Sequence, residues 1–219
     1  PPQVRAEYLN ILEPIAKGES EGLYLDESAG EFFIKFVETF CIQSEGPDAG
    51  KPYVLEPFQK AFAEAVFGVK SKVTRLRTFN EALLTIGRKN GKSAIASPLG
   101  LFLTFTENGA GVYCTATTQK QAREVWDGAC RLIDKNPSLS SVFRHRSFPA
   151  LEIIFADSKF ICLSNNPKKQ DGLKVSGGVI DEIHALPRRI FDVLNQGTST
   201  RREPLILEIG SAGYEREGL

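Results

Sequence analysis

Residues 83–93 combine a short apolar run, a cation-rich turn bounded by glycines, and a Gly-Lys-Ser triplet. The segment that follows, residues 94–105, is compatible with a helix. A strand, a turn and a helix in this order can form a phosphate-binding loop, because backbone N–H groups at a helix N-terminus attract phosphate oxygens. Lys92 would then reach the β- and γ-phosphates of a nucleotide, and the hydroxyl of Ser93 would bind Mg²⁺.

The spacing of this loop departs by one residue from the usual pattern. The first glycine of the pattern falls on Ile86, and the glycine itself comes one position later, at Gly87. A basic turn between two buried elements is therefore the alternative interpretation. If the loop binds phosphate, the residues that contact the nucleotide are Gly87, Arg88, Lys89, Asn90, Gly91, Lys92 and Ser93.

Two adjacent acids, Asp181 and Glu182, follow the apolar residues 179–180. In a phosphate-transfer site Asp181 would hold Mg²⁺ and Glu182 would orient or deprotonate the attacking water. Neighbouring side chains on a strand point to opposite faces, so both can serve only if the strand has ended by Glu182. The alternative is an exposed acidic strand end. Ligands bind at the carboxyl ends of parallel strands, which favours the catalytic interpretation.

Helices and strands alternate along the chain and would position these groups. The pattern indicates an α/β fold with a mostly parallel, doubly wound central sheet flanked by helices. We expect residues 72–79 to form an edge strand that turns into the central strand leading to the phosphate loop. Helices are expected over residues 4–17, 31–42, 57–67 and 94–105, after Thr117 or Thr118, and after Pro187; further strands are expected over residues 112–116, 151–155, 159–164, 175–181 and 205–209.

The composition limits the class of protein. The 219 residues carry 27 basic and 27 acidic side chains, so overall charge does not indicate a nucleic-acid partner. The four cysteines are widely spaced, which favours buried free thiols in a reducing compartment over zinc or disulfides. No apolar run reaches membrane-spanning length. The chain contains no methionine, and we expect it to be a fragment or processed piece of a longer protein.

Together, four segments resemble the large terminase subunits of tailed bacteriophages, the ATP-driven motors that package DNA. The similarity extends over about residues 53–213, with the segments in the family's order. They are Leu55-Glu56-Pro57-Phe58-Gln59, similar to the adenine-reading segment; residues 87–93, similar to the family's deviant phosphate loop; Asp181-Glu182, similar to its metal-binding and catalytic acids; and Ser211-Ala212-Gly213, similar to its coupling motif.

This resemblance implies a fold and a set of roles. The fold would be a P-loop NTPase of the additional-strand, catalytic-glutamate type, with a small helical region over residues 1–50 before an ATPase domain over residues 51–219. ATP and Mg²⁺ would be the cofactors, and Gln59 would read adenine. The coupling motif departs from the family's more polar form, with Ile209-Gly210 before Ser211. The family's C-terminal nuclease domain is absent from these 219 residues, so we expect no nuclease activity from them.

The resemblance also implies partners. They are double-stranded DNA, the portal protein of a procapsid, a small terminase subunit and further copies of the chain in a ring, in the cytoplasm of the bacterial host and without a membrane. An arginine would offset charge on the γ-phosphate during hydrolysis. Arg88 is the candidate in cis because it lies inside the loop, and Arg123 is the candidate in trans. The alternative for both is an ordinary surface cation.

Two other classes of function fit parts of this pattern. A helicase-like nucleic-acid translocase would share the Asp-Glu-x-His form of residues 181–184, but the chain has no room for the second motor domain that helicases need. A nucleotide-binding assembly protein would hold ATP without hydrolysing it. The presence of Glu182 speaks against this class, because a protein that only binds can dispense with the catalytic carboxylate.

Overall fold

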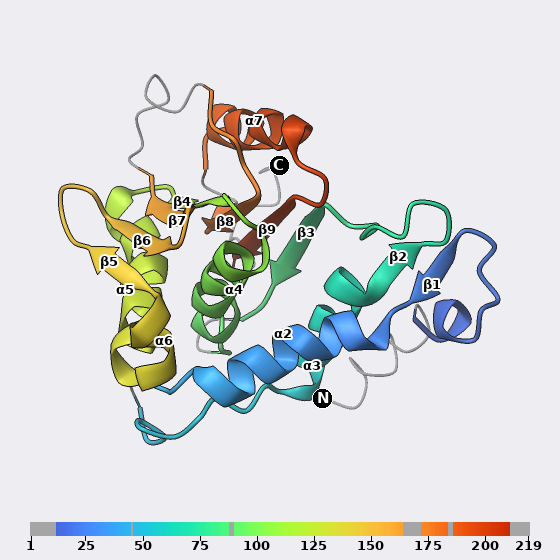
Figure 1. Ribbon diagram of the computed structural model, residues 1–219, viewed down its shortest axis with the longest axis horizontal. Coiled ribbons are helices and arrows are strands. Elements are labelled where there is room, and N and C mark those ends of the chain that lie inside the picture. Colours follow the sequence, from blue (N-terminus) through green and yellow to red (C-terminus); the bar gives the residue numbers. More distant parts are fainter. Residues whose placement is uncertain (1–11, 45, 88–89, 164–171, 184–185, 211–219) are drawn as a thin grey trace.

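The computed structural model describes residues 12–44, 46–87, 90–163, 172–183 and 186–210 (Figure 1). Its centre is a seven-stranded sheet in the order β3-β9-β8-β4-β7-β6-β5. The first five strands are parallel, and β6 and β5 run antiparallel to their neighbours. Their bounds are β3 (Glu81–Thr85), β4 (Gly111–Ala116), β5 (Arg144–Arg146), β6 (Glu152–Phe155), β7 (Ser158–Cys162), β8 (Gly177–Asp181) and β9 (Leu205–Gly210). The predicted α/β class with a mostly parallel sheet is confirmed.

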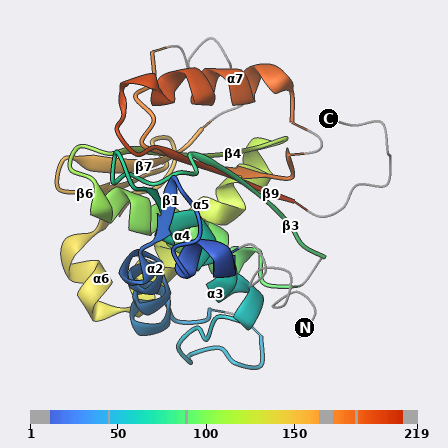
Figure 2. The ribbon, with the colours of Figure 1, turned by 90° about the vertical axis from the view of Figure 1, so that its right-hand side faces the viewer.

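Helices cover both faces of this sheet, as a doubly wound fold requires (Figure 2). The helix α7 (Arg188–Gly197) lies on one face, and α4 (Ser93–Thr106) and α5 (Gln119–Lys135) lie on the other. The sequence of α4 is apolar nearly all round, which is typical of a helix buried on every side. At Gly100 of α4 an added Cβ would meet the Phe160 ring at 2.5 Å, so glycine lets this helix lie close against β7.

The strand that leads into the phosphate loop is β3, and it lies at one edge of the sheet. Our expectation of a central position was wrong. Leu83 on β3 is 61% exposed, and among the described residues β9 is the strand that pairs with β3. The expected partner on the other side, residues 72–79, does not form a strand.

Residues 72–79 form turns and bends after the short strand β2 (Val69–Ser71). The Ser71 hydroxyl accepts hydrogen bonds from the backbone N–H groups of Val73 and Thr74, which holds the chain in a turn. The alternation of apolar and basic residues predicted a strand, but the apolar members have no core to face, and Val73 is 88% exposed. After this turn the chain returns beside β2, where Arg77 forms an isolated antiparallel bridge with Lys70, and residues 72–79 do not join the seven-stranded sheet.

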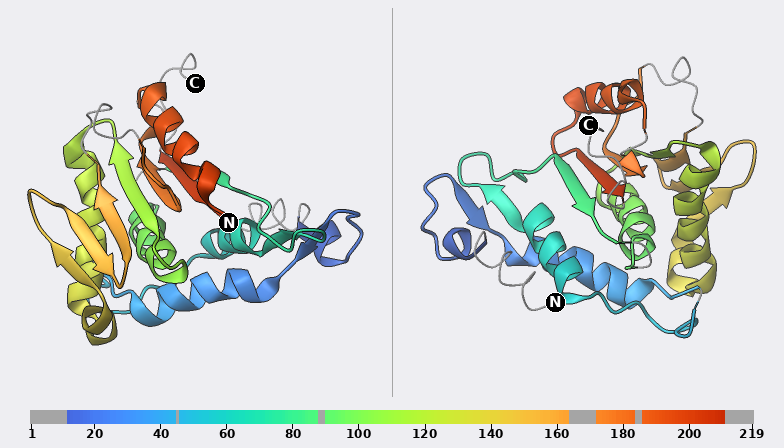
Figure 3. Two further views of the ribbon diagram at one scale, coloured as in Figure 1. Left: turned by 45° about the horizontal axis from the view of Figure 1, so that its top comes forward. Right: turned by 180° about the vertical axis from the view of Figure 1, so that it is seen from behind.

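The N-terminal elements pack onto the same core as the sheet (Figure 3). They are α2 (Glu27–Phe40), α3 (Pro57–Ala63) and η1, a π-helix (Glu64–Gly68); the strand β1 (Leu23–Leu25) precedes them and contributes no residue to this core. The aromatic stripe of α2 was predicted to face the core, and Phe33 and Phe36 contact Phe102 of α4 with ring centroids 5.1 and 5.5 Å apart. Strand β1 also pairs with β2, so contacts join residues 1–50 to the predicted ATPase domain.

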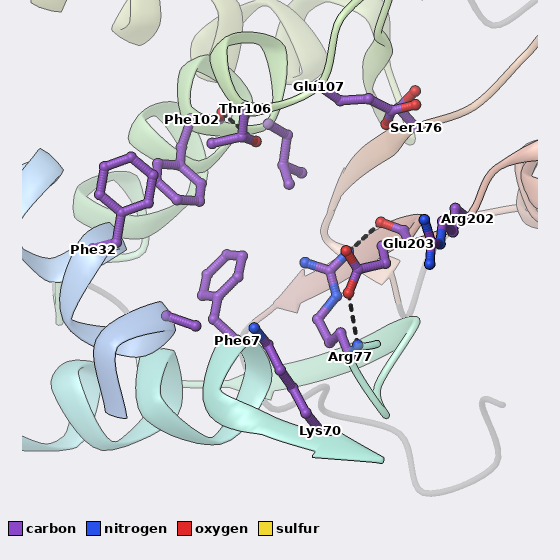
Figure 4. A pocket seen from close by; sticks show the side chains of 12 residues that line it. Phe32, Phe67, Lys70, Arg77, Phe102, Thr106, Glu107, Ser176, Arg202 and Glu203 are labelled. Atoms are coloured by element: carbon purple, nitrogen blue, oxygen red, sulfur yellow. Dashed lines mark hydrogen bonds between the residues drawn. The ribbon is translucent and has the colours of Figure 1, made fainter. Parts of the chain in front are cut away.

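A cavity of about 420 Å³ lies where these N-terminal elements meet the amino ends of β8 and β9 (Figure 4). It has an aromatic and a charged wall, whose main members are Phe32, Phe67, Phe102, Lys70, Arg77 and Glu203. The charged wall is largely paired internally: Arg77 donates to the Pro204 carbonyl at 3.2 Å, and Lys70 pairs with Asp26 at 2.7 Å. We therefore interpret this cavity as a packing junction between the N-terminal elements and the sheet.

Other sequence-based expectations agree with the structure. The hairpin β6–β7 is antiparallel, and Thr118 caps α5 by accepting a hydrogen bond from the Gln121 N–H. The helix α6 (Pro137–Val142) begins directly after the point where Asn136-Pro137 was expected to end α5. All four cysteines are buried and free. Within the described residues, no helix is both long and apolar enough to cross a membrane.

Candidate nucleotide site

The phosphate-loop segment connects the end of β3 to the start of α4. The Ile86 N–H donates to the Gly210 carbonyl of β9 at 3.0 Å, which extends the pairing by one residue beyond β3. Gly91 has φ +81°, a conformation that glycine adopts without strain, and its carbonyl accepts from the Ala94 N–H at 3.1 Å. The turn at Gly91 therefore leads directly into the N-terminus of α4, the end of a helix that attracts anions.

The two acids lie across from this helix start. Strand β8 ends at Asp181, and Glu182 has φ +53°, outside the strand region. The Glu182 N–H donates to the Ile209 carbonyl at 2.8 Å and to Asp181 Oδ1 at 3.0 Å. The condition that the strand must end by Glu182 is thus met, and both carboxylates turn toward one cation.

That cation is Lys92. Its Nζ lies 3.5 Å from Asp181 Oδ1 and forms a closer ion pair with Glu182 Oε1. Burial acts to lower the pKa of Lys92, but the hydrogen bond to Glu182 and the two negative charges outweigh it and raise the pKa. Burial also raises the pKa of Asp181. Lys92 is therefore fully protonated at neutral pH, the state in which it can bind phosphate.

These groups line a cavity of about 200 Å³. The side chains around it come from α4, α5 and the end of β8, and they are Lys92, Ser93, Ala96, Gln121, Glu124, Val125, Asp181 and Glu182. The donor set suits Mg²⁺, which takes oxygen ligands and commonly uses one or two protein groups together with substrate phosphates and waters. Ser93 Oγ and an Asp181 oxygen could supply such ligands, and the Lys92 ammonium could bind phosphate.

Comparison of the chain with known protein families shows which family contains it. The family described as "Terminase large subunit, ATPase domain" matches residues 57–219, which include every side chain around the cavity. The chain belongs to this family. The resemblance to large terminase subunits, inferred from the four sequence segments, is confirmed.

Individual terminases agree with the family assignment. The large terminase subunit of Enterobacteria phage HK97 is 29% identical over 192 residues, which cover 83% of this chain and 36% of that protein. The crystal structure of the HK97 bacteriophage large terminase matches with a TM-score of 0.69 and 26% identity, covering 83% of this chain and 37% of that one. The ATPase domain of the Thermus phage P74-26 large terminase, at 19% identity, shares the fold with a TM-score of 0.52 over 65% of this chain and 64% of its own. This terminase ATPase chain thus spans little more than a third of its HK97 relative.

Gln59, the predicted adenine reader, is 3% exposed and contacts the phosphate loop. Its Oε1 accepts from the Glu56 N–H at 2.8 Å, and its Nε2 donates to the Gly91 carbonyl at 3.4 Å. The side chain therefore ties the start of α3 to the loop of this terminase domain. Its role in reading adenine stays a prediction.

The remaining predicted residues are not all part of the observed site. Arg88 and Lys89 of the loop, and Ser211, Ala212 and Gly213 of the coupling motif, lie outside the described residues. Arg123 is described, and its Nε pairs with Asp127 Oδ2 at 3.2 Å on the exposed side of α5. It does not line the cavity of its own subunit, so any role of Arg123 in hydrolysis would be at the site of a neighbouring copy.

The sequence interpretation missed two residues of the cavity, Gln121 and Glu124 of α5. Thr118 and Gln121 fit a capping box, a local signal for the start of a helix. The place of Gln121 and Glu124 beside the acids follows from the pairing of β4 with β8, which sets Ala116 opposite Asp181. That register is a long-range feature that the local sequence pattern does not contain.

Proposed function

We propose that this chain is the ATP-hydrolysing motor domain of a phage DNA-packaging terminase and that it works with Mg²⁺. The observation that carries the proposal is the meeting of Lys92, Ser93, Asp181 and Glu182 around one cavity at the N-terminus of α4. A protein that only holds nucleotide needs the first two of these residues. An acid positioned behind the metal-binding carboxylate favours turnover.

In the proposed reaction, Lys92 exchanges its ion pair with Glu182 for the β- and γ-phosphates of ATP. The exchange releases the Glu182 carboxylate to orient and deprotonate the attacking water. The N–H groups of the loop and of the first turn of α4 bind phosphate oxygens, and Ser93 and Asp181 would hold Mg²⁺, which neutralises phosphate charge. Gln59 acts from the side of α3 and reads adenine. Arg88 offsets charge in cis, with Arg123 of a neighbouring copy as the alternative source.

The proposal extends to the setting in which the motor works. Double-stranded DNA is the translocated substrate, the portal of a procapsid and a small terminase subunit are partners, and several copies act as a ring in the host cytoplasm. Residues 1–50 serve as a helical N-terminal region and residues 51–219 as the motor, with Ser211, Ala212 and Gly213 coupling hydrolysis to movement. We expect no cutting of DNA by these 219 residues.

The test is ATP hydrolysis by the purified chain, with and without DNA and with Mg²⁺ added or chelated. We expect Mg²⁺-dependent phosphate release that Lys92→Ala abolishes, because the cation on the phosphates is lost. Lys35→Ala is the matched control, since Lys35 is an exposed lysine of α2 that pairs with Glu31. Nucleotide binding without phosphate release would favour the assembly-protein alternative and overturn the proposed activity.

A further inference from the structure

Gln121 lies on the first turn of α5, and its side chain is held at one end. Its Oε1 accepts hydrogen bonds from the Thr118 N–H at 3.2 Å and from Thr118 Oγ1 at 2.9 Å. The Gln121 N–H in turn donates to Thr118 Oγ1 at 3.2 Å. This reciprocal capping box fixes the side-chain amide of Gln121 relative to the start of the helix.

The capping box also decides which end of the amide faces the cap. A backbone N–H can only donate, so the atom that receives the Thr118 N–H must be the amide oxygen. The NH₂ group of Gln121 is therefore the end that stays available, and it carries two donors. The orientation of the amide follows from the hydrogen bonds alone.

The same side chain lines the nucleotide cavity beside Lys92, Asp181 and Glu182. The pairing of Ala116 with Asp181 sets the end of β4 next to the acids, and α5 begins three residues later, at Gln119. Carboxylates dominate this end of the cavity, since Glu124 also lines it. A neutral NH₂ donor is compatible with these acids and can still bind an anion.

We propose that Gln121 is a specificity-determining residue of the nucleotide site, whose Nε2 donates a hydrogen bond to an oxygen of the terminal phosphate of ATP. This inference rests on the proposed ATPase function and names the residue that distinguishes a triphosphate from a diphosphate. The terminal phosphate is the group nearest to Glu182 in the proposed reaction, and Gln121 lines the cavity next to that acid. ADP lacks the acceptor, so Gln121 contributes nothing to ADP binding.

The decisive variant is Gln121→Glu. Glutamate satisfies the capping box as well as glutamine does, so the start of α5 is kept, but the NH₂ donor becomes a carboxylate oxygen that repels phosphate. The matched control is Gln119→Glu, which places the same charge on the same exposed turn of α5, outside the residues that line the cavity. Both variants add one acid near the helix N-terminus and so share any effect on the helix dipole.

The measurement is titration calorimetry with adenylyl imidodiphosphate, a triphosphate that is not hydrolysed, and with ADP, both in the presence of Mg²⁺. We expect Gln121→Glu to weaken triphosphate binding about 10- to 100-fold and to leave ADP binding within about twofold, because a hydrogen bond to a charged group is lost. Gln119→Glu should bind both nucleotides as wild type does. Thermal unfolding without nucleotide should be unchanged in Gln121→Glu, as expected if the cap persists.

A second variant guards against failure to fold. Gln121→Met is neutral and similar in size, and it should also lose triphosphate affinity selectively. Equal losses for the two nucleotides in both variants, or no loss for either, would overturn the role of Gln121. A selective loss in Gln119→Glu would overturn it too, by assigning the effect to charge on the helix. If the wild-type chain binds neither nucleotide, the proposed ATPase function itself is wrong, an outcome distinct from a failure of Gln121.

Discussion

Glu182 and Lys92 form an ion pair beside the start of α4, and this pairing bears on the proposed reaction. Each is charged and partly buried, and Lys92 also forms a longer ion pair with Asp181. In the proposed reaction a triphosphate would supply replacement negative charge for Lys92, and Glu182 would then be free to act on water. Binding and activation would thus involve the same ion pair, and mutation can separate the two roles.

Glu182→Gln should keep ATP binding and lose turnover. The glutamine preserves the shape of the side chain, and it removes a carboxylate that competes with phosphate for Lys92. Loss of the proton acceptor should lower the rate of hydrolysis on the order of 10²- to 10³-fold. Steady-state phosphate release and equilibrium ATP binding measure the two effects, and near-normal turnover in this variant would remove Glu182 from the catalytic role.

Gly91→Ala should damage the phosphate loop beyond the cost of its backbone conformation. At Gly91 an added Cβ would meet Gln59 Nε2 at 2.8 Å, and φ is +81°. The control is Gly109→Ala, where φ is +67° and an added Cβ meets nothing within 4 Å. Both variants incur a strain of about 1 kcal/mol, but only Gly91→Ala should also weaken ATP binding. Similar ATP affinities in the two variants would contradict a coupling between Gln59 and the loop.

Among single residues, the sequence predicted those whose arrangement is determined by a short local motif. Gly91 and Lys92 lead into a helix that begins at Ser93, and Glu182 directly follows a strand that ends at Asp181, so local spacing was enough to place them. Gln121 was expected only as a member of the helix after Thr117 or Thr118, because its approach to the acids depends on strand pairing far along the chain. Side chains that enter a site from a third element are therefore the ones that local patterns miss.

Among the elements, the helices were predicted within a few residues where a long run of helix-compatible apolar residues marked them. The helix expected over residues 31–42 is α2 (Glu27–Phe40), and the one expected over residues 94–105 is α4 (Ser93–Thr106). The strand expected over residues 72–79 failed because alternation without a buried face does not stabilise pairing. The edge position of β3 was also missed, since the order of strands is set by tertiary packing and not by any one segment.

The pairing of β3 with β9 brings two acids together, and this predicts a pH-dependent stability. Burial and a hydrogen bond with Glu81 raise the pKa of Glu208 from 4.5 to about 7. The folded protein therefore keeps this proton at pH values where the unfolded chain has lost it. The free energy of unfolding should fall as the pH rises from about 4.5 to about 7 and should then level off.

Glu208→Gln should remove this part of the pH dependence, because a neutral amide cannot ionise. The variant should gain stability relative to wild type more at pH 8 than at pH 5, measured by denaturant unfolding at both values. Glu81→Gln is the companion variant, and it should give a smaller change in the same direction because it removes one of the causes of the raised pKa. Parallel pH profiles for wild type and Glu208→Gln would show that this pair does not titrate in the stated range.

For the whole molecule, the main question is whether one chain contains a complete catalytic site. The described cavity offers a lysine that could bind phosphate, two possible ligands for a metal and an acid that could act on water. All of these groups come from one subunit. The exposed guanidinium of Arg123 pairs with Asp127 on the outside of α5, where a neighbouring copy in a ring could receive it. Arg88 belongs to the loop and needs no neighbour.

The dependence of activity on protein concentration separates these two arrangements. If Arg88 is the arginine that offsets charge on the γ-phosphate (the arginine finger), ATP hydrolysis per subunit should stay constant across a wide dilution series. Arg88→Ala should then be slower by roughly 10³- to 10⁵-fold. Arg123→Ala should keep the wild-type rate.

A rate that rises steeply with concentration, together with an inactive Arg123→Ala, would instead assign the finger to a neighbouring copy. In that case Arg123→Ala subunits, whose own catalytic cavity is intact, would recover activity when mixed with Lys92→Ala subunits, because the latter still offer Arg123. Arg88→Ala subunits could not be rescued by any partner, since a loop residue acts only on the phosphates that its own loop binds.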